Sequence, residues 1–247
     1  MDELAALEAD VEILIEYADG VARADEVLVD RRRDLVWRNP RLALEVGQAL
    51  MASDDPDRRE MGVDLIGVAA QLDHSLRDHA LPPLRAALDD AGPGPLSAAI
   101  IQLELLGDES IRDRILPNAG HPDEVVRHAV AFALPSPGLD ELALDALIGL
   151  TRDVDDEVRD WATFGLAELS DADNEAIRGA LLARVEDDPY EIRVEAIVGL
   201  ARRQDERVRP HLVRELSGPD HADVLDDALE YLEQGTGRHW QADTSPG

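Results

Sequence analysis

The side chains that could do chemistry in this chain are carboxylates, arginines and histidines. Its 247 residues include no cysteine and no lysine, so all 24 basic residues are arginine. Thiolate nucleophiles, cysteine-based zinc sites, Schiff bases and phosphate-binding lysines are therefore excluded. The sequence also lacks the glycine-rich phosphate loops, the serine nucleophile elbow and the paired-histidine zinc motif. We expect no catalytic residue, no cofactor and no enzymatic activity.

Histidine spacing offers one candidate metal site. His121, Glu124 and His128 lie at positions i, i+3 and i+7, which could place three ligands along one helix face. His121 directly precedes Pro122, however, which favours a position in the turn before the helix, with its side chain pointing away from His128. Carboxylate pairs are weak evidence among 54 acidic residues, and those at turns are interpreted as helix caps. We predict no metal site.

Aromatic residues are scarce, at 3%, and three of them share a pattern. Phe132 and Phe164 each follow an arginine by five residues, and Trp161 lies three residues before Phe164, on a similar helix face. These rings either pack between neighbouring helices or form an exposed strip that anchors a partner, with polar side chains as its rim. The predicted partner groove comprises Phe132, Trp161, Phe164, Asp160, His128 and Glu195.

The charge of the chain restricts its partners. The 54 acidic residues against 24 arginines give a net charge of −30, and no stretch is basic. Such a surface repels nucleic acid and attracts a basic segment of a protein or peptide. No apolar run approaches the ~20 residues that span a bilayer, and the acidic start does not resemble a signal peptide. We expect a cytoplasmic monomer without nucleic-acid or membrane partners.

One pattern repeats along the chain. It reads DEVVRHAVAFAL at 123–134, DDEVRDWATFGL at 155–166 and PYEIRVEAIVGL at 189–200. The arginines of these copies are 32 and 34 residues apart, and weaker copies begin at Arg59, Leu96 and Leu225. Apolar positions three, four and seven apart predict a helix in each copy, and another amphipathic stretch precedes each one. Such helix pairs bury their apolar stripes only by stacking, which predicts an all-α solenoid.

The copies at 123–134 and 155–166 resemble the HEAT repeats, in particular the bacterial type named after phycobilisome lyases. The resemblance covers roughly residues 41–233 and implies a right-handed, armadillo-like α-α superhelix. It implies that the helix with the Val-Arg pair is the second of each pair and lines the concave face. It also implies a structural ladder between repeats, formed by Arg127, Arg159, Arg193, Asp156 (or Asp155) and Asp188.

The same pattern predicts three parts of the chain. Residues 1–40 are expected to form N-terminal capping helices, and residues 41–233 a solenoid of about six helix pairs. Residues 234–247 lack periodicity and are expected to form a mobile tail.

Three functions are open at this point. We favour a non-enzymatic adaptor that holds a partner in its acidic groove. A HEAT-type enzyme is the first alternative, either a chromophore lyase or a DNA alkylation-repair glycosylase. Arg159, Asp160 and Trp161 faintly resemble the Trp, Asp and Arg residues that such a glycosylase has on its concave face. The acidic surface argues against DNA binding. The second alternative is an acidic nucleic-acid mimic, or immunity protein, that blocks a basic partner.

Overall fold

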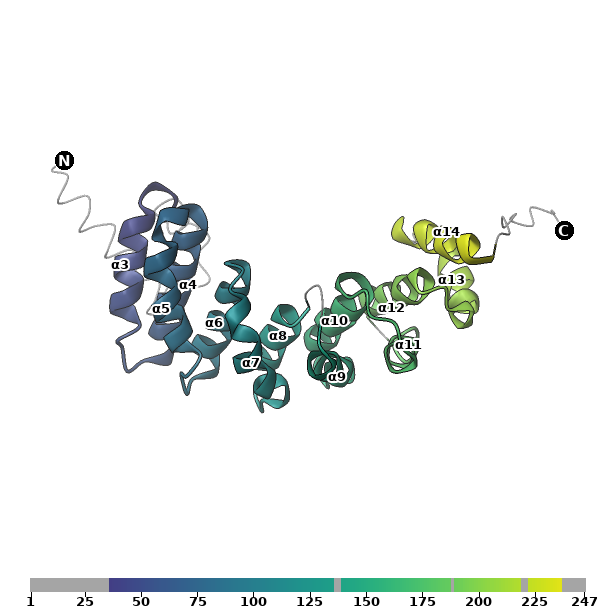
Figure 1. Ribbon diagram of the computed structural model, residues 1–247, viewed down its shortest axis with the longest axis horizontal. Coiled ribbons are helices and arrows are strands. Elements are labelled where there is room, and N and C mark those ends of the chain that lie inside the picture. The colour runs from purple at the N-terminus through teal and green to yellow at the C-terminus, as the bar shows by residue number, and fades with distance from the viewer. Residues whose placement is uncertain (1–35, 136–138, 188, 219–221, 237–247) are drawn as a thin grey trace. The chain divides into compact units, whose positions relative to one another are not determined.

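The structure is a computed structural model that describes residues 36–135, 139–187, 189–218 and 222–236. Every regular element in these ranges is helical, and the helices follow one another in pairs (Figure 1). The prediction of an all-α repeat fold is confirmed. Most of the predicted capping segment 1–40 lies outside the described residues. None of the described helices is long and apolar enough to cross a membrane.

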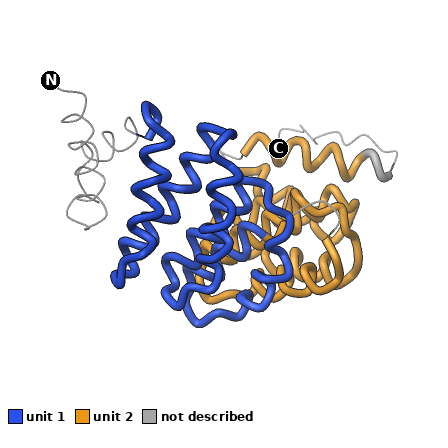
Figure 2. The backbone as a smooth tube through the Cα atoms, turned by 60° about the vertical axis from the view of Figure 1, so that its left-hand side comes forward, with its two compact units in different colours: residues 1–133 blue, residues 134–247 orange. Residues whose placement is uncertain are grey.

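The chain divides into two compact units, which are described separately. Unit 1, residues 1–133, is blue in Figure 2. Its helices are α3 (Pro40–Leu50), α4 (Pro56–Leu72), α5 (Arg77–Ala87), α6 (Pro93–Leu105), α7 (Arg112–Ile115) and α8 (Glu124–Ala133). The second helices of the pairs, α4, α6 and α8, pack side by side, so they form one layer of this unit.

Unit 2, residues 134–247, repeats this arrangement. Its helices are α9 (Glu141–Leu150), α10 (Asp156–Phe164), α11 (Glu175–Leu182), α12 (Tyr190–Arg202), α13 (Arg209–Leu216) and α14 (Val224–Thr236). Helix α12 packs between α10 and α14, again forming a layer of second helices. Helix α14 runs to Thr236, so it includes the first three residues of the predicted tail.

Asparagine and aspartate begin many of these helices by accepting hydrogen bonds from backbone N–H groups that have no partner inside the helix. Asn39 accepts from Leu42 N, and Asp155 accepts from Val158 N. Asp155 is therefore the cap of α10. This leaves Asp156, of the two candidates, for the ladder.

The core of unit 2 lies along one face of its second helices. On α10, Val158 and Ala162 are fully buried, as the repeat pattern predicts. Helical spacing would put Leu169, seven residues after Ala162, on the same buried face, yet Leu169 is 43% exposed. Residues Gly165–Leu169 form a π-helical turn, whose wider spacing rotates the following side chains away from the core.

Candidate functional site: an acidic and aromatic face in unit 2

The six predicted groove residues are divided between the units. His128 and Phe132 lie half-buried on α8 of unit 1. The other four, Asp160, Trp161, Phe164 and Glu195, lie on α10 and α12 of unit 2. Because α10 and α12 pack side by side, these four residues can be described as one surface.

Trp161 and Phe164 form an aromatic pair on the flank of α10. Their ring centroids are 5.9 Å apart and their planes meet at 86°, an edge-to-face arrangement. Both side chains are half-buried, since the core positions of α10 are taken by Val158 and Ala162. The rings therefore pack against the fold and also contribute to the surface. The apolar strip does not continue onto α12, where the equivalent residue, Val198, is only 3% exposed.

Carboxylates on the same segments lie close enough to act on one another. Glu195 is half-buried on α12, and burial, followed by the charges of Glu168 and Asp160, raises the pKa of Glu195 to about 7. Burial also raises the pKa of Asp160, with Glu157 and Glu191 adding to the effect. Two oxygens, Asp160 Oδ1 and Glu168 Oε1, are buried and receive no hydrogen bond from the described residues. Negative charge is therefore held here at an energetic cost.

Arg202 supplies positive charge to this surface. It forms an ion pair with Glu168, and its guanidinium lies over the ring of Tyr231 on α14, 6.0 Å from the centroid. The charge of Arg202 opposes the rise in the Glu195 pKa but does not cancel it. We call this surface the acidic–aromatic face and define it by Asp160, Trp161, Phe164, Glu168, Glu195 and Arg202.

Sequence position could have indicated part of this arrangement. Glu168 and Arg202 each lie nine residues after the arginine of their repeat, and Trp161 and Glu195 each lie two residues after it. Equivalent positions on neighbouring helices of a repeat protein lie side by side. Opposite charges at one repeat position therefore predict the Glu168–Arg202 pair.

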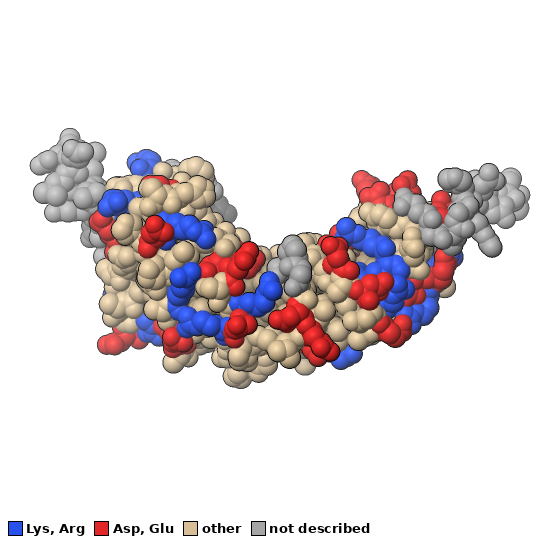
Figure 3. Space-filling model, in the orientation of Figure 1, with Lys and Arg blue, Asp and Glu red and all other residues tan. Residues whose placement is uncertain are grey.

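A small cleft of about 150 Å³ adjoins the acidic–aromatic face near the N-terminal ends of α10 and α12. It is lined by Asp156, Glu157, Asp160, Pro189, Glu191 and Ile192. Within the described parts of the chain, no group of three or more histidine, aspartate or glutamate side chains could hold a metal ion. Charged side chains of both signs are interspersed on the visible face of each unit (Figure 3).

Arg159, which the resemblance placed in the ladder, binds the turn before its own helix. Its Nη1 donates to the carbonyl oxygens of Asp153 and Val154, at 2.8 and 3.2 Å. Its Nε donates to Asp187 Oδ2 of the next repeat, at 3.3 Å, and its Nη2 donates to Asp156. One guanidinium thus connects two successive turns.

The other repeat arginines make related contacts. Arg59 donates to Ser53 O and Asp54 O at 3.1 and 2.9 Å, Arg127 to His121 O and Pro122 O at 2.9 and 3.1 Å, and Arg193 to Asp187 O at 2.8 Å. Arg59 also pairs with Asp90 in the next repeat, at 2.7 Å, and Arg193 with Glu215, at 3.5 Å. Asp188, which the resemblance placed in the ladder, lies outside the described residues.

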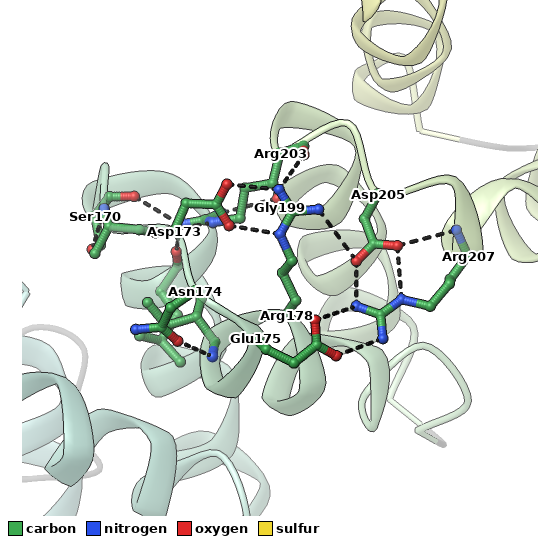
Figure 4. Close-up of polar contacts among 12 residues, drawn as sticks. Ser170, Asp173, Asn174, Glu175, Arg178, Gly199, Arg203, Asp205 and Arg207 are labelled. Atoms are coloured by element: carbon green, nitrogen blue, oxygen red, sulfur yellow. Dashed lines mark hydrogen bonds and ion pairs between the residues drawn. The ribbon is translucent and has the colours of Figure 1, made fainter.

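A second set of ion pairs, which the sequence did not predict, lies in unit 2. It connects the turn before α11 with the turn between α12 and α13 (Figure 4). Arg178 of α11 donates to both oxygens of Asp173, at 2.7 and 2.6 Å, and lies 3.6 Å from Asp205. Arg207 donates to Asp205 at 2.8 Å and to Glu175 at 2.7 Å. Asp205 is only 4% exposed, and the bond from Arg207 lowers its pKa. This network fixes one repeat against the next.

The corresponding turn of unit 1 is built in the same way. Arg85 donates to both oxygens of Asp108, at 2.6 and 2.8 Å, and this bond is the main reason that the Asp108 pKa falls to about 2. Asp108 follows Gly107, whose φ is +66°, and Asp205 follows Gln204, whose φ is +54°. In both turns the aspartate N–H donates to a carbonyl five residues earlier, which closes the end of the preceding helix.

Arg203 holds the segment that follows the π-helical turn. Its Nη2 donates to the carbonyl oxygens of Leu166, Ser170 and Ala172, at 2.6, 2.8 and 3.0 Å (Figure 4). Burial lowers the pKa of Arg203 from its ordinary value. Its guanidinium therefore acts as a cap for backbone carbonyls and supports the π-helical turn that carries Glu168.

Comparison with known proteins identifies the repeats. The family model described as HEAT repeats matches residues 81–167 and 145–233, together more than half of the chain. "Protein YibA" of Escherichia coli K12 and that of strain O157:H7 are each 38% identical to this chain over 105 residues, which is 42% of this chain and 36% of either relative. This alignment thus spans about a third (36%) of the length of these curated relatives.

The X-ray structure of Escherichia coli YibA aligns with this chain at a TM-score of 0.72 and 22% identity, covering 96% of this chain and 88% of that one. At this identity the alignment shows a shared fold. The repeated arginines that join successive turns agree with these matches, and the chain belongs to the HEAT-repeat family.

Proposed function

We propose that this chain is a non-enzymatic protein-binding module that holds a basic segment of a partner protein on its acidic–aromatic face. The observation that carries this proposal is the half-buried Trp161–Phe164 pair beside three partly desolvated carboxylates. Aromatic side chains that are already ordered by packing make effective anchors, because they lose little conformational freedom on binding.

Charge supports a basic occupant. This face has three carboxylates, those of Asp160, Glu168 and Glu195, and one arginine, Arg202, within a chain of net charge −30. Complementary charge would increase the association rate and select against acidic partners. Because Asp160 Oδ1 and Glu168 Oε1 are buried, an arginine or lysine side chain docked on this face would stabilise their carboxylates by its charge.

The glycosylase alternative is less well supported. It required Arg159 to act beside Asp160 and Trp161, as the faint resemblance suggested. The Arg159 guanidinium already donates to two turn carbonyls and to Asp187. We therefore assign Arg159 to the scaffold and Trp161 to partner binding.

The test is binding of short arginine-rich and glutamate-rich peptides, measured by fluorescence anisotropy at constant moderate salt. We expect the wild type to prefer the arginine-rich peptides. A variant with Trp161→Ser and Phe164→Ser should bind them about thirtyfold or more weakly, as when a hot spot is lost. The matched control is Trp37→Ser, which removes a tryptophan that is 66% exposed in unit 1.

Circular dichroism must show that both variants keep the helical content of the wild type. Equal binding by the double serine variant and the wild type would contradict the role of the aromatic pair. Failure of the wild type to prefer basic peptides would contradict the proposed partner class.

A further inference from the structure

The carboxylates of the acidic–aromatic face come from three adjacent segments of unit 2. Asp160 lies on α10, Glu168 in the π-helical turn and Glu195 on α12. The positive charge that acts on Glu195 is that of Arg202, which pairs with Glu168 and lies over Tyr231 of α14. The group therefore combines three acidic side chains with one arginine whose charge is already used.

Two oxygens of this group are buried without a hydrogen-bond donor among the described residues, namely Asp160 Oδ1 and Glu168 Oε1. A carboxylate oxygen that is buried without a donor is unfavourable, and neighbouring carboxylates make it more so. The free protein can relieve this cost by binding a proton. In agreement, burial and the charges of Glu168 and Asp160 raise the pKa of Glu195 to about 7, against an ordinary value of 4.5.

A cation from a partner would relieve the same cost in another way. A guanidinium beside this group would stabilise the charged form of Glu195 and lower its affinity for protons. Trp161 occupies the repeat position equivalent to that of Glu195 on the neighbouring helix. A cationic side chain that reached Glu195 would therefore meet an aromatic ring as well as a carboxylate.

We infer that the acidic–aromatic face is a proton-coupled receptor for an arginine side chain of its partner: the carboxylate group binds a proton when the face is empty and releases it when arginine docks. This inference rests on the proposed function. It adds that affinity for a basic segment increases with pH across neutrality. The proton passes from the carboxyl group to solvent, and the arginine keeps its own protons throughout.

The experiment is isothermal titration calorimetry of the full chain with a six-arginine peptide, at pH 6, 7 and 8 and constant ionic strength. Each titration is repeated in two buffers of different ionisation enthalpy, so that the heat reports protons released on binding. If the group titrates near pH 7 when empty and below pH 6 when occupied, affinity should increase about tenfold from pH 6 to pH 8. At pH 7 about half a proton should be released for each peptide bound.

Glu195→Gln is the decisive variant, because it keeps the shape of the side chain and removes its titration. We expect it to bind the peptide with an affinity that varies less than twofold between pH 6 and pH 8, without buffer-dependent heat. The matched control is Glu230→Gln, an exposed glutamate on α14, which should behave as the wild type does. Circular dichroism at each pH verifies that the variants stay folded.

The outcomes separate this inference from the proposed function. Tight binding by the wild type at every pH, without proton release, overturns the inference and leaves the binding module intact. Proton release that persists in Glu195→Gln overturns the assignment to this carboxylate group. Absence of binding at every pH overturns both.

Discussion

The raised pKa of Glu195 has a consequence for stability that does not depend on any partner. In the folded protein the pKa of this carboxyl is about 7, against an ordinary value of 4.5. Between these two values the folded chain binds more protons than the unfolded chain, so the contribution of Glu195 to stability decreases as pH increases. Below pH 4.5 the carboxyl is protonated in both states, and its charge no longer matters.

The size of the effect follows from the shift. At about 1.4 kcal/mol for each pH unit, the difference between 4.5 and about 7 corresponds to about 3 kcal/mol. Glu195 is only half-buried, and solvent screening reduces this to about 1–2 kcal/mol. Glu195→Gln removes this charge. The variant should therefore gain stability relative to the wild type, from near zero at pH 4.5 to about 1–2 kcal/mol at pH 8.

The assay is urea denaturation at several pH values, followed by far-ultraviolet circular dichroism, with Glu230→Gln as the control. Because the other titrating groups are common to both proteins, the difference between wild type and variant isolates Glu195. A difference that stays constant from pH 5 to pH 8 would refute the reasoning, since it would show that Glu195 titrates alike in the folded and unfolded chains.

Three further predictions concern the scaffold, and denaturant melts check each of them. Gly62→Ala should destabilise unit 1 by about 1–3 kcal/mol, because an added Cβ would lie 2.6 Å from a backbone oxygen of α3. Gly149→Ala is the matched control: the added Cβ would have nothing within 4 Å, so this substitution should stabilise the protein by about 1 kcal/mol. Gln204→Gly should stabilise by about 0.5–1 kcal/mol, since its φ of +54° suits glycine, and a loss would show that the Gln204 side chain contributes more than its strain costs. Arg159→Ala should lower the free energy of unfolding by about 2–3 kcal/mol, because two turn carbonyls and Asp187 lose their donor. Its control, Arg152→Ala, removes an exposed arginine and should cost less than about 0.5 kcal/mol. Equal losses of stability for the two variants would remove Arg159 from the ladder.

The repeat fold could be predicted because its signals are local and recur. The arginines at 127, 159 and 193 return at nearly constant spacing, each within a helix-period pattern. Turn aspartates that cap helices are visible in the sequence for the same reason, as at Asp155. What these signals specify is the pairing of helices, and the paired all-α fold is confirmed.

Backbone features that no residue type requires could not be predicted. The π-helical turn at Gly165–Leu169 adds no motif to the sequence, yet it exposes Leu169 and positions Glu168. The turn at Gln204 has the backbone conformation that Gly107 shows in its own turn, without the glycine that would indicate it. The acceptors of Arg203 are backbone carbonyls, which have no sequence signature at all.

The repeat arginines make contacts that lysine could not make. Arg159 serves two carbonyls and two carboxylates at once, which the planar, five-donor guanidinium allows and a single ammonium does not. Such arginines are held at the joints between repeats, where they face turns. Most of the charge left accessible to solvent is therefore that of acidic side chains. Because these arginines are directed toward the scaffold, they offer little positive charge to a partner. A partner that approaches the face around Glu195 would therefore meet mainly negative charge.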